Sequence, residues 1–311
     1  MAKKVKSTKQ PRGRGTQRRP TAKPSPRTVA AARRALQRRV RSDRTQRYKE
    51  YLAWLKETPR WVRAAVAEAR PLQILAEGDS WFEYPVPGGG GGVIVQLEKL
   101  IDLKILNMAH HGDEVRQMLA LSQREEILKR LTNSAITYDA LLFSGGGNDL
   151  VGDQFVLWLR DSQPSVPPED LLDGPRVDAV LGVVQAGYND LIAIRDQHSP
   201  NTKIFFHGYD FPRVTGEGVC GLGPWLKPSL DFRGIHDSEA QFRVARALLL
   251  RFASMLQSLA NPAKNIFYVP TQGTLNPDAD WANEIHPTAG GFEKIAQRFR
   301  TVLKEQFPQM P

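Results

Sequence analysis

The chain has 311 residues, of which 41% are hydrophobic and 24% charged, a composition typical of a globular protein with a sizeable core. Its formal net charge of +10 is uneven, because residues 1–50 hold 18 Lys and Arg against 2 Asp and Glu. The single cysteine, Cys220, excludes an intrachain disulfide and fits a reducing compartment. With no apolar run of secretory or membrane-spanning length, we expect a cytoplasmic protein without a transmembrane segment.

The N-terminal region is expected to lie outside the main domain. Residues 1–27 are rich in Lys, Arg, Pro, Gly, Ser and Thr and lack the apolar surface that would offset the entropy of ordering. Helices are predicted over Thr28–Glu57 and from Thr58 to about Ala69. The chain is thus divided into a basic, largely disordered or helical tail (1–45), a helical lead-in (46–70) and a main domain (71–311).

The main domain alternates strands and helices, which predicts a parallel sheet covered by helices on both faces. The five predicted strands are Leu72–Ala76, Leu103–Asn107, Tyr138–Phe143, Lys203–His207 and Asn265–Val269. The predicted helices are Val93–Ile101, Asp113–Leu131, Arg176–Asp196, Asp237–Leu259 and Thr288–Glu305. Three long or unusual loops, Tyr84–Gly92, Ser162–Pro175 and Tyr209–His236, follow strand ends or turns and are expected to wall a substrate cleft.

Polar residues follow the first strand directly, in Gly78-Asp79-Ser80-Trp81. A serine at the carboxyl end of a parallel strand lies where open α/β sheets place their chemistry. An ordinary helix cap explains the same residues equally well when the segment is taken alone. Two distant segments favour a nucleophile: Gly145-Gly146-Gly147-Asn148 after the third strand, and Asn283-Glu284-Ile285-His286 before the last helix.

In this order along the chain, the three segments resemble the motif blocks of the SGNH (GDSL-type) hydrolases, and the resemblance covers roughly Leu72 to the C-terminus. It implies an α/β fold: a three-layer α/β/α sandwich, flavodoxin-like, with a five-stranded parallel sheet and here a basic N-terminal extension. It also implies a serine hydrolase that cleaves carboxylic esters, in the esterase, lipase or deacetylase class, without a cofactor. The expected substrate is a small-molecule, lipid or carbohydrate ester.

The resemblance assigns roles to particular residues. Ser80 is the expected nucleophile and His286 the base that takes its proton. The oxyanion donors are expected to be the backbone amide of Ser80, the side-chain amide of Asn148 and the backbone of Gly112, which lies in a degenerate second block. The scattered histidines have no spacing typical of a metal site, so no metal is predicted.

The chain departs from the family pattern where an aspartate usually stands three residues before the histidine. That position is Asn283, whose amide oxygen can fix the imidazole tautomer but supplies no negative charge. Asp280 or Glu284 would restore a triad, whereas Asn283 or a backbone carbonyl would orient a Ser–His dyad. We expect the dyad, because Glu284 should point the other way in an extended loop and Asp280 would need a turn to return.

The basic tail suggests an alternative function. Lys/Arg-rich segments bind phosphate backbones without sequence preference, so the chain is alternatively a nucleic-acid or anionic-surface binding protein, using residues 1–45, whose hydrolase domain is inactive or secondary.

Overall fold

The computed structural model describes residues 26–57 and 70–310 of the chain. It divides into two compact units, one that ends at Ser42 and one that begins at Asp43. The helix predicted from Thr58 to Ala69 lies outside the described residues, as does most of the segment predicted to be disordered. The first described helix, α1 (Pro26–Glu57), begins two residues earlier than predicted and runs across the division between the units.

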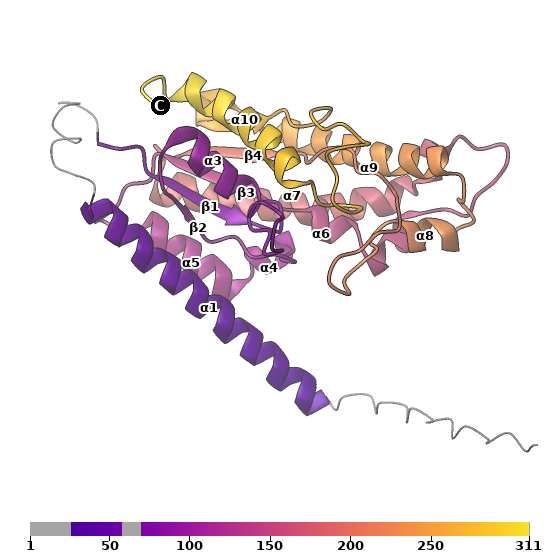
Figure 1. The fold of residues 1–311 in the computed structure, drawn as a ribbon, viewed down its shortest axis with the longest axis horizontal. Helices are drawn as coiled ribbons and strands as arrows, with labels where there is room; N and C mark the ends of the chain where they lie inside the picture. The colour runs from indigo at the N-terminus through magenta and orange to yellow at the C-terminus, as the bar shows by residue number, and fades with distance from the viewer. Residues whose placement is uncertain (1–25, 58–69, 311) are drawn as a thin grey trace, which may run out of the picture. The chain divides into compact units, whose positions relative to one another are not determined.

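A five-stranded, all-parallel sheet forms the centre of the second unit (Figure 1). Its strands are β1 (Ile74–Gly78), β2 (Ile105–Asn107), β3 (Ala140–Ser144), β4 (Lys203–His207) and β5 (Ile266–Val269). The strand order is β2-β1-β3-β4-β5, which is the order of flavodoxin-like folds. The predicted fold class is therefore confirmed, and each predicted strand is present with bounds shifted by at most two residues.

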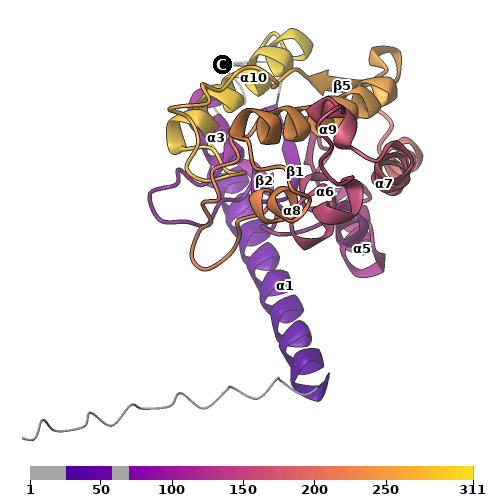
Figure 2. The ribbon, with the colours of Figure 1, turned by 90° about the vertical axis from the view of Figure 1, so that its right-hand side faces the viewer.

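Helices cover both faces of the sheet, as Figure 2 shows with α3 and α10 on one side and α5 and α7 on the other. The connection from β1 to β2 moves towards one edge of the sheet, whereas the later connections move towards the other edge. Because each crossover is right-handed, the helix between β1 and β2 lies on the face opposite to the helices of those later connections. Helix α3 accordingly packs against α10, whereas α7 packs against α5 and α9. The helices are α3 (Val93–Ile101), α4 (Val115–Met118), α5 (Leu121–Leu131), α6 (Gly147–Leu150), α7 (Gly174–His198), α8 (Lys227–Phe232), α9 (Ser238–Leu259) and α10 (Ala289–Gln306), with 3-10 turns η1 (Asp153–Trp158), η2 (Pro168–Leu171) and η3 (Pro262–Lys264).

The prediction of one continuous helix over Asp113–Leu131 is wrong, because two separate helices, α4 and α5, occupy this range. Ala120 between them has an extended backbone, which interrupts the helical hydrogen-bond ladder. A tertiary contact fixes the start of α4, because the Val115 N–H donates to the Asp149 carboxylate at 2.8 Å. Val115 itself is fully buried.

The last part of α1 belongs to the core of the second unit. Arg44 is 5% exposed and pairs at 2.9 Å with Glu77, a fully buried carboxylate on β1. Burial raises the pKa of Glu77 to about 7, although Arg44 opposes the shift. Arg44 lies within the predicted tail (1–45), so the residues that fold with the sheet begin before the predicted boundary.

Helix α7 is long and apolar enough, by length and mean hydropathy alone, to cross a membrane. Buried side chains line one of its faces, among them Val177, Leu181, Val184 and Leu191, at the spacing of a core-facing helix. Only 33% of its most apolar stretch is buried, and Val183 within the helix is exposed, so packing accounts for part of its apolar character. The absence of a transmembrane segment stays a prediction.

Candidate active site

Ser80 lies in the turn directly after β1, at the point where the chain turns away from the sheet. Since β1 connects to β2 on one side and pairs with β3 on the other, this is the switch point of the strand order, where α/β sheets bind ligands. A side chain on Gly78 would meet the Ser144 carbonyl oxygen of β3 at 2.6 Å. Glycine is therefore required at 78 for the two strands to approach.

His286 reaches Ser80 from the loop between β5 and α10. An isolated bridge between Trp281 and Pro287 closes this loop, and the Thr288 side chain caps α10 immediately after it. The Nε2 atom of His286 lies 2.8 Å from Ser80 Oγ, although the residues are 206 positions apart. The structure thus brings together the two residues that the sequence predicts as nucleophile and base.

Asn283 orients the His286 ring through its amide oxygen, Oδ1, which lies 3.0 Å from His286 Nδ1. The same oxygen accepts the backbone N–H groups of Ile285 at 3.2 Å and His286 at 3.1 Å. The amide nitrogen instead donates to the Tyr84 hydroxyl at 3.1 Å. Because two backbone donors require an acceptor at this position, the oxygen faces the ring. His286 Nδ1 therefore carries the proton, and Nε2 is free to accept from Ser80.

The two carboxylates that would restore a triad are both engaged elsewhere. Asp280 pairs with Lys294 at 2.7 and 2.9 Å and accepts the Asn276 N–H. Glu284 is fully buried, and its carboxylate accepts four backbone N–H groups of the long loop after β4, from Gly216, Trp225, Leu226 and Lys227. The predicted arrangement of a Ser–His pair with a neutral orienter is the one that the structure contains.

The surroundings of His286 favour its neutral form. Burial lowers the pKa of His286 to about 4, and the more distant His111 acts in the same direction. The ring of Tyr84 lies beside it with a centroid distance of 4.6 Å, and Trp225 meets it edge-on at 5.3 Å. At neutral pH the imidazole is therefore uncharged, which is the form that a general base requires.

Asn148 and Gly112, the other predicted site residues, lie in different surroundings. Asn148 sits on α6 and lines the same cavity as Ser80, while its amide nitrogen donates one hydrogen bond to the Asp113 carbonyl at 3.0 Å. Among the described residues, this nitrogen makes no further hydrogen bond. Gly112 has φ 80°, a backbone region that favours glycine, and is not among the described residues that line the cavity. Its role as an oxyanion donor stays a prediction.

A buried polar network behind Ser80 was not predicted from the sequence. Asp79 accepts hydrogen bonds from the Ser144 hydroxyl at 3.0 Å and the Tyr209 hydroxyl at 2.6 Å. His207 Nε2 lies 3.0 Å from Ser144 Oγ, and its Nδ1 accepts the Tyr209 N–H at 3.2 Å. Burial raises the pKa of Asp79 to about 6 and lowers that of His207 to about 3. Only the assembled fold shows this network, because its members come from three different strand ends.

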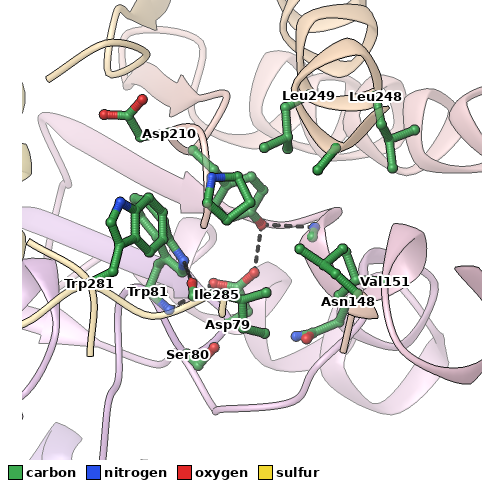
Figure 3. Close-up of a pocket in the computed structure, with 15 residues that line it drawn as sticks. Asp79, Ser80, Trp81, Asn148, Val151, Asp210, Leu248, Leu249, Trp281 and Ile285 are labelled. Atoms are coloured by element: carbon green, nitrogen blue, oxygen red, sulfur yellow. Dashed lines mark hydrogen bonds between the residues drawn. The ribbon is translucent and has the colours of Figure 1, made fainter. Parts of the chain in front are cut away.

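A cavity opens beside Ser80, with Trp81 and Trp281 on one side, Val151 and Asn148 on the other, and Leu248 and Leu249 at the far end (Figure 3). Of the three loops expected to wall a cleft, the one over Tyr209–His236 does so through Tyr209, Asp210, Pro212 and Leu226. The loop over Tyr84–Gly92 contributes Tyr84 to the His286 side, and Ser162–Pro175 does not line this cavity.

Among the described residues, no group of three or more His, Cys, Asp or Glu side chains is arranged to hold a metal ion. The chemistry available is that of a hydroxyl, a neutral imidazole and an amide around an apolar cavity.

No protein-family model matches the chain, and no curated protein sequence matches it either. Solved structures are similar to it. A candidate SGNH hydrolase from Slackia heliotrinireducens is 13% identical, over 75% of this chain and 100% of that one, with a TM-score of 0.48. The lipase Lip_vut3 from a goat rumen metagenome is 18% identical, over 74% and 96%, at 0.46.

A family 3 carbohydrate esterase from Talaromyces cellulolyticus is likewise similar, 13% identical over 77% of this chain and 100% of that one, with a TM-score of 0.45. TM-scores below 0.5 and identities below 20% establish neither an activity nor a substrate.

Proposed function

We propose that this chain hydrolyses carboxylic esters through an acyl-enzyme on Ser80. The observation that carries the proposal is the 2.8 Å contact between Ser80 Oγ and His286 Nε2, with Nδ1 of the same ring held by the Asn283 amide oxygen. This tautomer leaves the Nε2 lone pair to accept the hydroxyl proton, which is the arrangement of an activated serine. The sequence resemblance to SGNH hydrolases points to the same reaction.

The proposed reaction follows from these positions. Ser80 Oγ bonds to the acyl carbon while its proton moves to His286 Nε2, and the resulting oxyanion accepts hydrogen bonds from the Ser80 backbone N–H and the Asn148 amide. The bond to the alkoxy oxygen then breaks, and His286 returns the proton to the leaving alcohol. Water then bonds to the acyl carbon while its proton moves to His286. The bond between the acyl carbon and Ser80 Oγ breaks, His286 returns the proton to Ser80 Oγ, and the carboxylic acid leaves.

The orienting group distinguishes this site from a full triad. Asn283 fixes the ring but carries no charge, so the imidazolium that forms during the reaction lacks an ionic partner. The proposal is therefore a Ser–His dyad with a neutral orienter, and Gly112 is retained in it as a third candidate oxyanion donor.

The Ser80→Ala variant tests the proposal. It should abolish turnover of p-nitrophenyl esters and labelling by a fluorophosphonate probe while its circular dichroism spectrum matches that of the parent chain. Ser144→Ala, on the neighbouring strand end, is the matched control and should still be labelled. Undiminished labelling of folded Ser80→Ala would refute Ser80 as the nucleophile.

Helix α1 supports a second candidate function, binding to nucleic acid. Its first part, residues 26–42, holds six arginines and no acidic residue, and Arg34, Arg38 and Arg39 are exposed. Such a row binds phosphate backbones with an affinity that falls steeply with salt. Residues 26–42 contain only three large apolar residues, Val29, Leu36 and Val40. This number is too small for the apolar face of a helix that lies on a membrane surface.

Replacing Arg34, Arg38 and Arg39 with glutamine tests this second function. The triple variant should lose affinity for a duplex oligonucleotide in a fluorescence anisotropy titration, and the salt dependence of the remaining binding should be shallower. Because these residues are remote in sequence from Ser80, ester turnover should be unchanged. Equal affinity of the two proteins for DNA would refute nucleic-acid binding by α1.

A further inference from the structure

The cavity beside Ser80 is walled almost entirely by apolar side chains. They are supplied by the turn after β1, the segment after β3, the long loop after β4, helix α9 and the loop before α10. The apolar lining residues are Trp81, Val151, Pro212, Leu226, Ala245, Leu248, Leu249, Trp281 and Ile285. This composition suits a hydrocarbon chain, because moving apolar surface out of water and against other apolar surface lowers the free energy.

The polar groups in the cavity wall are largely occupied by the protein itself. The Asp79 carboxylate accepts hydrogen bonds from Trp81, Ser144 and Tyr209. The Asp210 carboxylate accepts four backbone N–H groups, from Phe211, Gly273, Thr274 and Leu275. Trp281 Nε1 is a single buried donor without a partner. Beyond Ser80 and Asn148, which the reacting carbonyl engages in the proposed function, this one donor does not satisfy a sugar ring, whose hydroxyl groups each need partners when they leave water.

The cavity lies on the acyl side of the reaction centre. Its lining includes Ser80 and Asn148, the nucleophile and the oxyanion donor of the proposed function, but neither His286 nor Tyr84. The leaving alcohol has to be near His286 Nε2, since that atom returns the proton to it. A group in the cavity is therefore attached to the carbonyl carbon and not to the leaving oxygen.

We propose that this cavity binds the linear aliphatic acyl chain of the substrate, with four or more carbons, and so makes the protein selective for esters of fatty acids over acetyl esters. The inference rests on the proposed function, because it takes Ser80 as the acylated residue. In Figure 3 the chain would run from Ser80, between the tryptophans and Val151, towards Leu248 and Leu249 on α9.

A series of p-nitrophenyl esters from acetate to octanoate tests the inference on the intact protein. The alcohol is constant along the series, so differences in kcat/KM report the acyl chain alone. Each methylene buried against apolar surface raises kcat/KM by about fourfold, the equivalent of about 0.8 kcal/mol. We expect hexanoate to exceed acetate by at least about tenfold. A profile that is flat or that falls from acetate would overturn the inference.

Variants on α9 locate the effect in this cavity. Ala245→Phe fills the cavity and should reduce the ratio of kcat/KM for hexanoate to that for acetate by at least about tenfold. Leu248→Ala enlarges the far end and should move the preferred chain to greater length. Leu250→Phe is the matched control, because Leu250 is on the same helix, 39% exposed and outside the cavity lining, so its profile should equal that of the parent chain.

The outcomes separate the inference from the function on which it rests. If Ser80→Ala abolishes turnover but the three α9 variants share one chain-length profile, the acyl cavity is refuted and the Ser80 hydrolase stands. If no ester is turned over at Ser80, both are refuted. If Ala245→Phe does not fold, the parent profile and Leu248→Ala still decide the question.

Discussion

The described residues of the second unit contain two serine–histidine pairs, and only one of them has the geometry that the proposed reaction needs. Ser80–His286 and Ser144–His207 have similar distances, 2.8 and 3.0 Å between hydroxyl oxygen and Nε2, and both histidines are buried with lowered pKa values. The pairs differ in what meets the other ring nitrogen. Proximity and burial alone therefore do not identify the reactive serine.

The tautomer distinguishes the two pairs. His207 Nδ1 accepts the Tyr209 N–H, so its proton lies on Nε2 and is donated to Ser144, which in turn donates to Asp79. His207 has no lone pair left for the Ser144 proton. His286 Nδ1 instead faces the Asn283 oxygen, so its Nε2 accepts from Ser80. Ser144 and His207 therefore belong to the framework, whereas Ser80 lines the apolar cavity and His286 contacts it from beside that cavity.

Replacing each histidine gives the largest expected effect. His286→Ala should lower kcat by about 10⁴- to 10⁶-fold, because the base is lost from a unit that acts together. His207→Gln should lower kcat by less than about tenfold and should reduce the free energy of unfolding by about 1–3 kcal/mol, the range for a disrupted buried hydrogen bond. Single-turnover kinetics and urea denaturation measure the two quantities. Equal losses of kcat would contradict the framework role of His207.

Asn148→Ala comes next in size. Removal of one oxyanion donor costs about 10²–10³ in kcat, and KM should change far less because the donor acts on the transition state. Steady-state kinetics on one p-nitrophenyl ester measures both. Asn276→Ala, in the loop before α10 and outside the cavity lining, serves as an asparagine control. A change confined to KM would show that Asn148 binds substrate in the ground state.

The positions of the strands along the chain were predictable because apolar runs are a local pattern, and the three motif segments were predictable because they resemble those of a known family. Apolar runs predict the buried strands. Ser80 follows β1, Asn148 lies in the short helix after β3, and His286 precedes the capped helix α10. Contacts between distant segments were not predictable. The sequence suggests Glu284 as an alternative acid for His286. In the structure its buried carboxylate instead accepts four backbone N–H groups from the loop after β4.

Tertiary packing also explains the errors in the sequence-based prediction. The break between α4 and α5 follows from the anchoring of Val115 by Asp149, which no helical pattern records. Tyr84 lies in a Pro- and Gly-rich loop without any catalytic signature, and only the folded chain brings its hydroxyl to the Asn283 amide. The His207–Ser144 pair is hidden for the same reason, since its residues end two different strands.

Tyr84→Phe should have a smaller effect, a loss of about tenfold or less in kcat. The variant removes the acceptor of the Asn283 amide nitrogen, while the two backbone donors to Oδ1 still oppose a flip. If Tyr84 positions the Asn283 amide, Tyr84→Phe should lower kcat by a smaller factor in an Asn283→Asp background, because both oxygens of a carboxylate accept hydrogen bonds. Additive losses of kcat in the double variant would show that Tyr84 acts by packing alone.

Asn283→Asp should change the rate least and the pH dependence most. In the parent chain, kcat/KM should rise as pH increases through about 4, the pKa of His286, and then stay level to neutral pH, because only the neutral ring accepts the serine proton. A carboxylate at the 3.0 Å position of Oδ1 favours the imidazolium and should move this limb up by about 1–3 pH units. It also stabilises the imidazolium formed during acylation, so kcat on the plateau should rise by less than about tenfold, or 1.4 kcal/mol.

The geometry allows the exchange, since the new oxygen would accept from the Tyr84 hydroxyl where the amide nitrogen now donates. Asp280→Asn, which changes charge in the same loop at the Lys294 pair, is the matched control and should leave the acid limb in place. If the limb moved in Asp280→Asn but not in Asn283→Asp, the charge felt by His286 would come from Asp280. The neutral orienter, and with it the contrast between the two serine–histidine pairs, would then be wrong.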